Sequence, residues 1–125
     1  MVRRDRALTV LELLRAIIAL PAVESTRRTM GFERAVSTMR ARGTHRLQRE
    51  WSQRLFLQRA IAWLDSHIPG GTNCYRRVLL ELSLDAGAAS EPVLIGLNPR
   101  GGPRSGHVWL ASSTPLEHYE VKLAL

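Results

Sequence analysis

Apolar residues recur at helical spacing along the first half of the chain. Thr9 and Glu12 are spaced as in a capping box, which predicts the start of a helix. Pro21 is expected to break or restart this helix, which then continues to about Met30. The apolar residues of its first part fall on one helical face: Leu11, Leu14, Ile17 and Ile18.

Two further helices are predicted before residue 69. The first covers 32–42 and is closed by Gly43, and its inward residues are Phe32, Val36 and Met39. The second covers 45–67, with a stripe broad enough to indicate burial on more than one side. The apolar positions of that stripe are Leu47, Trp51, Leu55, Ala62 and Leu64.

A break at 68–71, Ile-Pro-Gly-Gly, precedes a fourth helix. This helix is predicted to cover 74–84, because apolar residues again recur at helical spacing. Its buried face is expected to contain Val78, Leu79 and Leu82. Its first residue, Cys74, is the only cysteine of the chain.

Beyond Gly87 the apolar runs are short and bounded by turn residues, which predicts strands rather than helices. The expected strands are 92–97, 107–111 and 118–124, in an antiparallel meander. The predicted fold class is therefore α+β, in one domain over 1–125. Residues 1–68 form its mainly helical portion, and 69–125 form a Cys-bearing helix packed on a small antiparallel sheet.

Composition narrows the classes of protein that fit this pattern. One cysteine in 125 residues excludes an internal disulfide framework and a Cys-rich zinc site, so the expected compartment is a reducing cytoplasm. The N-terminus imitates a signal peptide, but Glu12 and Arg15 interrupt it at the spacing of an amphipathic helix. No run of about 20 apolar residues occurs, so no membrane span is expected.

The positive charge of the chain is concentrated in its first half. Residues 1–60 hold thirteen Arg and five acidic residues, a net charge of +8, whereas 61–125 have a net charge of −1. A basic half can attract nucleic acid, anionic lipid or an acidic peptide. Seventeen Arg against one Lys also fits a general arginine bias on a solvated surface. Because no RNP box or convincing helix-turn-helix pattern is present, nucleic acid is not the expected partner.

Cys74 is the candidate nucleophile. A thiolate at a helix N-terminus is stabilised by unpaired backbone N–H groups and by the positive end of the helix dipole. A histidine from elsewhere in the fold can take the thiol proton. His107 starts a predicted strand after a Gly-rich loop, a position from which side chains commonly reach a site. The alternative is that Cys74 is a small buried hydrophobic residue without chemistry.

The order of these features resembles a known family. The motifs that carry the resemblance are Cys74-Tyr-Arg-Arg77, Leu79-Leu80, Gly87, Ile95-Gly96-Leu97 and His107-Val-Trp109-Leu110. From about Leu8 to Val121 the chain resembles the transglutaminase-like leader peptidases of lasso-peptide biosynthesis. The resemblance implies a transglutaminase/papain-like fold, with Cys74 as the nucleophile and His107 as the base.

The resemblance also implies a third catalytic residue, and here the chain departs from the family pattern. The family carries an Asp about a dozen residues after the His, but this chain has no Asp after Asp85, and Ala111 replaces a usual Glu. Glu120 lies nearest the expected place and Glu117 is the alternative, since holding the imidazole requires only an acceptor. A Cys-His-Glu triad, a Cys-His dyad and a non-catalytic family member all remain open.

The expected function is that of a cysteine peptidase that removes the leader from a ribosomally made precursor peptide during lasso-peptide maturation. The resemblance implies three partners, namely the precursor peptide, a separate leader-recognition protein and the lasso cyclase. No cofactor or metal is expected. Two other functions fit the sequence. One is a transglutaminase-type acyl transferase that uses the same Cys–His pair, and the other is a non-catalytic basic helical binding protein.

Overall fold

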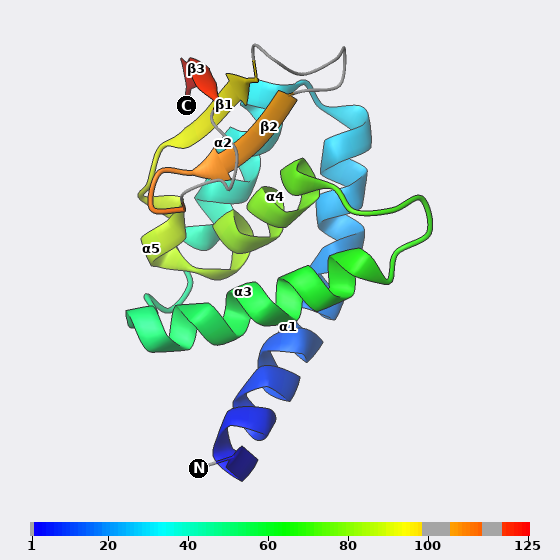
Figure 1. Ribbon diagram of the computed structural model, residues 1–125, viewed down its shortest axis with the longest axis vertical. Helices are drawn as coiled ribbons and strands as arrows, with labels where there is room; N and C mark the ends of the chain where they lie inside the picture. Colours follow the sequence, from blue (N-terminus) through cyan, green and yellow to red (C-terminus); the bar gives the residue numbers. More distant parts are fainter. Residues whose placement is uncertain (1, 99–105, 114–118) are drawn as a thin grey trace.

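The computed structural model describes residues 2–98, 106–113 and 119–125 of the chain. Its helices are α1 (Val2–Thr29), α2 (Phe32–Gly43), α3 (Trp51–Ser66), α4 (Cys74–Leu84) and α5 (Ala86–Ala89). Its strands are β1 (Val93–Leu97), β2 (Gly106–Leu110) and β3 (Glu120–Ala124). Helices form the first two thirds of the molecule and a small antiparallel sheet forms the rest (Figure 1), which confirms the α+β class.

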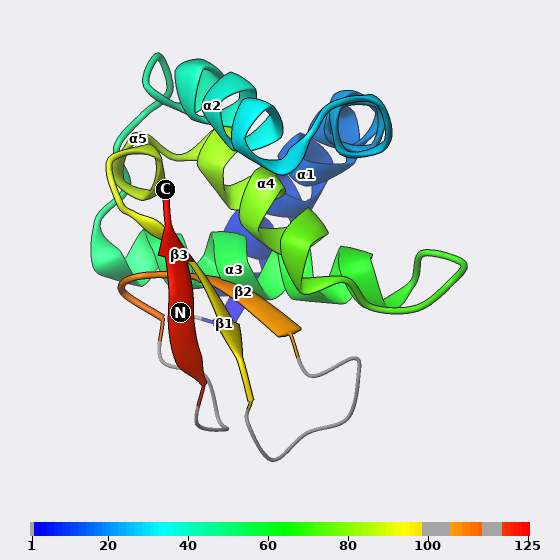
Figure 2. The same cartoon turned by 90° about the horizontal axis from the view of Figure 1, so that it is seen from above.

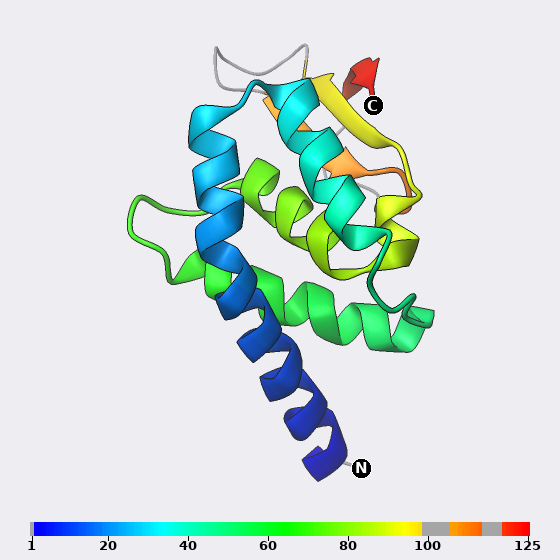
Figure 3. The same cartoon turned by 180° about the vertical axis from the view of Figure 1, so that it is seen from behind.

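The first helix, α1, begins earlier than predicted and passes through Pro21. Thr9 is not a cap, because its Oγ1 donates a hydrogen bond to the Asp5 carbonyl one turn earlier, at 2.8 Å. Pro21 has no N–H to offer the Ile17 carbonyl, and α1 bends along its length without ending (Figure 3). The predictions of a capping box at Thr9 and of a break at Pro21 are therefore wrong.

The predicted apolar face of α1 points to solvent. Its four residues are 43–79% exposed, and Ile18 is the most exposed of them. The opposite side of α1 packs on the core through Ala16 and Val23 and also buries Glu12. The N-terminal half of α1 projects beyond the rest of the molecule, past its crossing with α3 (Figures 1 and 3).

Helix α2 matches its prediction, with Val36 and Met39 buried and Phe32 packed against the core. Gly43 is the last residue of α2, but it is required for a different reason than a left-handed cap. A Cβ atom at Gly43 would lie 1.7 Å from the carbonyl oxygen of Leu82. The glycine therefore allows α2 and α4 to approach each other closely.

Helix α3 begins at Trp51, six residues after the predicted start. The preceding segment is held in a non-helical path by α4 and α5, because the Arg49 N–H donates to Asp85 Oδ1 at 2.9 Å. Of the predicted stripe, Leu64 is buried, but Leu47 and Trp51 are 70% and 55% exposed. The buried residues of α3 are Arg54, Leu57, Ala60, Ile61, Leu64 and Asp65.

The sheet has the strand order β2-β1-β3, so the predicted meander is wrong. Strand β1 lies in the middle, and β2 and β3 form the two edges (Figure 2). Val93 of β1 and the paired Leu110 of β2 belong to the core cluster, together with Leu79 and Leu82 of α4. This face of the sheet therefore packs against α4, which leaves β2 next to the Cys-bearing helix.

Candidate functional site

The N-terminus of α4 is capped by Asn73. Its side-chain oxygen accepts a hydrogen bond from the Arg76 N–H at 3.0 Å, and its carbonyl accepts one from the Arg77 N–H at 3.1 Å. Cys74 follows as the first helical residue, as predicted, and is a partly buried free thiol. The Cys74 N–H takes no part in this cap, so it is one of the first-turn donors that a helix leaves for another acceptor.

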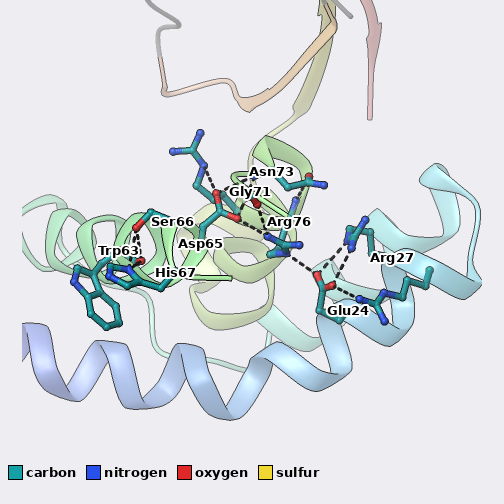
Figure 4. Close-up of polar contacts among 11 residues, drawn as sticks. Glu24, Arg27, Trp63, Asp65, Ser66, His67, Gly71, Asn73 and Arg76 are labelled. Carbon is teal, nitrogen blue, oxygen red and sulfur yellow. Dashed lines mark hydrogen bonds and ion pairs between the residues drawn. The ribbon is translucent and has the colours of Figure 1, made fainter. Parts of the chain in front are cut away.

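A buried ion-pair network fixes this helix terminus against α3 and α1 (Figure 4). Asp65 of α3 is fully buried, accepts the Asn73 N–H with both carboxylate oxygens, and binds Arg76 Nη1 at 2.9 Å. Arg76 also donates from Nε to Glu24 of α1 at 2.7 Å. Because these groups are withdrawn from water and paired, the network holds the backbone around Cys74 in one position.

The arginine partners of Glu24 in this network lower the pKa of its carboxyl group. The pKa of this carboxyl is lowered from 4.5 to about 2, mainly by the hydrogen bond from Arg27 and also by the hydrogen bond and positive charge of Arg76, which together outweigh the opposing effect of burial. Glu24 is therefore held as a carboxylate throughout the ordinary pH range. Sequence patterns did not identify Glu24, Asp65 or Arg76, because their spacing along the chain carries no motif.

Cys74 and His107 line the same pocket, which has a volume of about 240 Å³. The pocket lies between α3, α4 and β2. Its lining residues are Gln58, Ile61, Ala62, Cys74, Arg77, Val78, Glu81, His107, Val108, Trp109, Leu110 and Ser113. The structure thus brings the predicted nucleophile and the predicted base to one cavity from two elements far apart in sequence.

His107 lies in an aromatic cluster on β2. Its ring stacks on Tyr119 at 5.0 Å and on Trp109 at 5.6 Å between ring centroids. Gly96 lies on β1 directly opposite His107 of β2. It leaves room for this cluster, because a Cβ atom at Gly96 would lie 2.7 Å from the Trp109 ring. Gly96 and Trp109, which both belong to the motifs that carry the family resemblance, therefore help to fix the position of the His107 ring through packing.

The structure does not bring Glu120 to the pocket. Glu120 pairs with Leu97, whereas Val121 pairs with Gly96 and therefore shares the sheet face of His107. The Glu120 carboxylate is exposed and binds Lys122 Nζ at 3.1 Å. Glu117, the alternative third residue, lies outside the described residues.

Glu81 is a pocket residue that sequence reasoning missed. It lies two helical turns after Cys74 on α4, so both side chains reach the same cavity. Burial raises the pKa of Glu81, against the opposing charge of Arg54, whose Nη2 lies 3.2 Å from the carboxylate. Gln58 Nε2 donates to the same oxygen at 3.4 Å. The sequence signal that could have identified Glu81 was its position seven residues after Cys74, which places both side chains on the same face of a helix.

Across the part of the chain that the structure describes, no group of three or more His, Cys, Asp or Glu side chains is arranged to hold a metal ion. No helix there combines the length and apolar content that a membrane crossing requires. Comparisons with protein-family models, curated proteins and solved structures found no match to this chain.

Proposed function

We propose that the protein is a cysteine peptidase of the transglutaminase/papain-like type, which cleaves the leader from a precursor peptide in lasso-peptide maturation. The observation that carries this proposal is the shared pocket, lined by Cys74 at a helix N-terminus and by His107 on the neighbouring strand. The resemblance of the sequence motifs supports the substrate class. The rest of the pocket supplies polar groups on α3 and α4, among them Gln58 and Arg77.

In the proposed reaction, His107 takes the thiol proton of Cys74, and Sγ attacks the carbonyl carbon at the leader–core junction. The tetrahedral intermediate collapses when the core amine leaves with the proton from His107, which gives a thioester between the leader and Cys74. Water then attacks the thioester and gives its proton to His107. The thiolate leaves, takes that proton back, and releases the leader carboxylic acid.

The negative oxygen of the intermediate requires hydrogen-bond donors. The Cys74 N–H is suited to this role, because Asn73 caps the N–H groups of Arg76 and Arg77 but not that of Cys74. The positive end of the α4 dipole adds to the stabilisation. No third catalytic residue is assigned among the described residues, so the proposed machinery is a Cys–His dyad.

The outward face of α1 is the proposed docking site for the leader-recognition protein. Leu11, Leu14 and Ile18 have the 3-4 spacing of a seam that packs against another helix, and each is at least 43% exposed. An apolar stripe on both sides of a helix indicates that the outer side is also covered in a complex. Exposed arginines at the start of α1 favour a partner whose apolar face is bordered by carboxylates.

The test is cleavage of the precursor peptide in the presence of the recognition protein, followed by mass spectrometry. Wild type should release free leader and core, with a mass gain of one water shared between the two products. Cys74→Ala should release neither, because alanine keeps the helix and removes the sulfur. Leader joined to an added amine would instead indicate acyl transfer. Cleavage by Cys74→Ala at the wild-type rate would rule out the assigned nucleophile.

A further inference from the structure

Strand β2 is an edge of the sheet, and its free edge borders the pocket. Four consecutive residues, 107–110, line the cavity. Successive side chains of a strand point to opposite faces, so a cavity that contacts all four lies along the edge of the strand and not over one face. Within the described residues, the order β2-β1-β3 places no other strand on that side.

The hydrogen bonds of the sheet show which backbone groups point to that edge. Val93 of β1 exchanges both of its backbone hydrogen bonds with Leu125, at 2.7 and 2.8 Å, on the side away from β2. Ala111 N–H donates to the Pro92 carbonyl at 3.1 Å, on the side toward β2. Backbone groups alternate along an antiparallel pair, so Ile95, two residues after Val93, also points away from β2.

Val108 pairs with Ile95, so its own N–H and C=O point away from β1 and toward the pocket. Leu110 is the next residue with this orientation, but its carbonyl accepts the Ser113 N–H at 2.8 Å. Val108 therefore offers one donor and one acceptor side by side on a strand edge, next to a cavity that Cys74 also lines. An unpaired strand edge of this kind is a template for an added strand.

We propose that a peptide binds in extended form along the free edge of β2, with one of its residues hydrogen-bonded to both backbone groups of Val108. This inference rests on the proposed peptidase function, since it makes the added strand the substrate segment that reaches Cys74. Main-chain pairing supplies affinity independently of side chains, and the pocket between α3 and α4 supplies the selection. The substrate class is therefore a segment that is unfolded before binding.

The experiment tethers a peptide to Cys74 and does not require catalysis. The probe is acetyl-Ala-Val-Ala-cysteamine, activated as its pyridyl disulfide, which forms a mixed disulfide with the only cysteine of the chain. Hydrogen exchange of backbone amides is then followed by NMR. The Val108 N–H should exchange at least about 10-fold more slowly in the tethered protein. The Ala111 N–H, already bonded to Pro92, is the internal control.

Two N-methylated probes test the alternation that strand pairing requires. One carries the methyl group on the Val nitrogen and the other on both Ala nitrogens. One of the two should remove the protection of Val108, and the other should retain it. Unchanged Val108 exchange with the parent probe, or a Cys74 that accepts no probe, overturns the inference. If the tethered probe protects the Val108 N–H but the protein cleaves no precursor, the inference of an added strand stands and only the proposed peptidase function is rejected.

Discussion

Glu120 is the residue at which sequence and structure differ most for the site. Its distance from His107 along the chain fits the family pattern, but it lies on β3, on the sheet face opposite to His107, and binds Lys122. Distance along the sequence could not reveal this, because β3 pairs with β1 and not with β2. The sequence left open which sheet face Glu120 occupies, and the pairing of β3 with β1 decides it.

Glu120→Gln should therefore leave the cleavage rate within about threefold of wild type, as expected for a surface residue outside the machinery. His107→Ala should lower the same rate by a factor on the order of 10³ or more. Both are measured on the precursor with the recognition protein present. A loss of 10²-fold or more in Glu120→Gln would restore the triad and would show that β3 is displaced in the active protein.

The lowered pKa of Glu24 predicts a pH dependence of stability. A carboxyl with a pKa of about 2 in the folded protein and 4.5 in the unfolded chain binds fewer protons when folded. Its contribution is therefore full above about pH 5 and is lost as the pH falls toward 2. Glu24→Gln should be less stable than wild type at pH 7 in urea unfolding, and the difference should shrink between pH 5 and pH 2. A difference that stays constant over this range contradicts the assigned network.

At the scale of elements, local pattern was sufficient for α2, for α4 and for the existence of three strands. It failed for most of α3, whose buried face combines Arg54 and Asp65 with apolar residues that the predicted stripe left out, such as Leu57 and Ile61. These charges are buried because Glu81, Asn73 and Arg76 pair with them. Such partners come from other elements, so a single-helix pattern cannot predict them. The predicted strand order was wrong for the same reason, because the order of strands in a sheet depends on contacts with other elements and not on the pattern within each strand.

The close approach of α2 to α4 gives a test at this scale. Gly43→Ala should destabilise the protein by at least about 2 kcal/mol, because the added Cβ would overlap the Leu82 carbonyl. Gly31→Ala is the matched control, since a Cβ there meets nothing within 4 Å, and its cost should stay below about 1 kcal/mol. The free energy of unfolding is obtained from urea denaturation. Equal losses in the two variants would show that the helices are further apart than described.

At the scale of the whole molecule, buried ion pairs take up part of the basic character of the first half. Arg49 binds Glu12 and Asp85, and Arg54 binds Glu81 and Glu91, all with little solvent exposure. Arg40 donates to three carbonyl groups near α5 and the C-terminus, those of Ala89, Glu91 and Leu125. Net charge alone therefore overstates the surface that would attract nucleic acid.

The exposed face of α1 gives the prediction at this scale. Leu14→Glu combined with Ile18→Glu should reduce the acceleration of cleavage by the recognition protein at least about 10-fold, because charges enter the centre of an apolar contact. The rate of the peptidase alone should not change, since neither residue lines the pocket. Leu47→Glu, at an exposed apolar position outside α1, is the control. Full acceleration in the double variant would place the partner elsewhere.

The central claim is that Cys74 and His107 act as a pair, and alkylation by iodoacetamide at pH 7 tests it without a substrate. The chain has one cysteine, so the measured rate constant belongs to Cys74 alone. Wild type and Glu120→Gln should react at the same rate, and His107→Ala should react at least about 10-fold more slowly, because the imidazole no longer takes the thiol proton. Equal rates in wild type and His107→Ala would contradict the account.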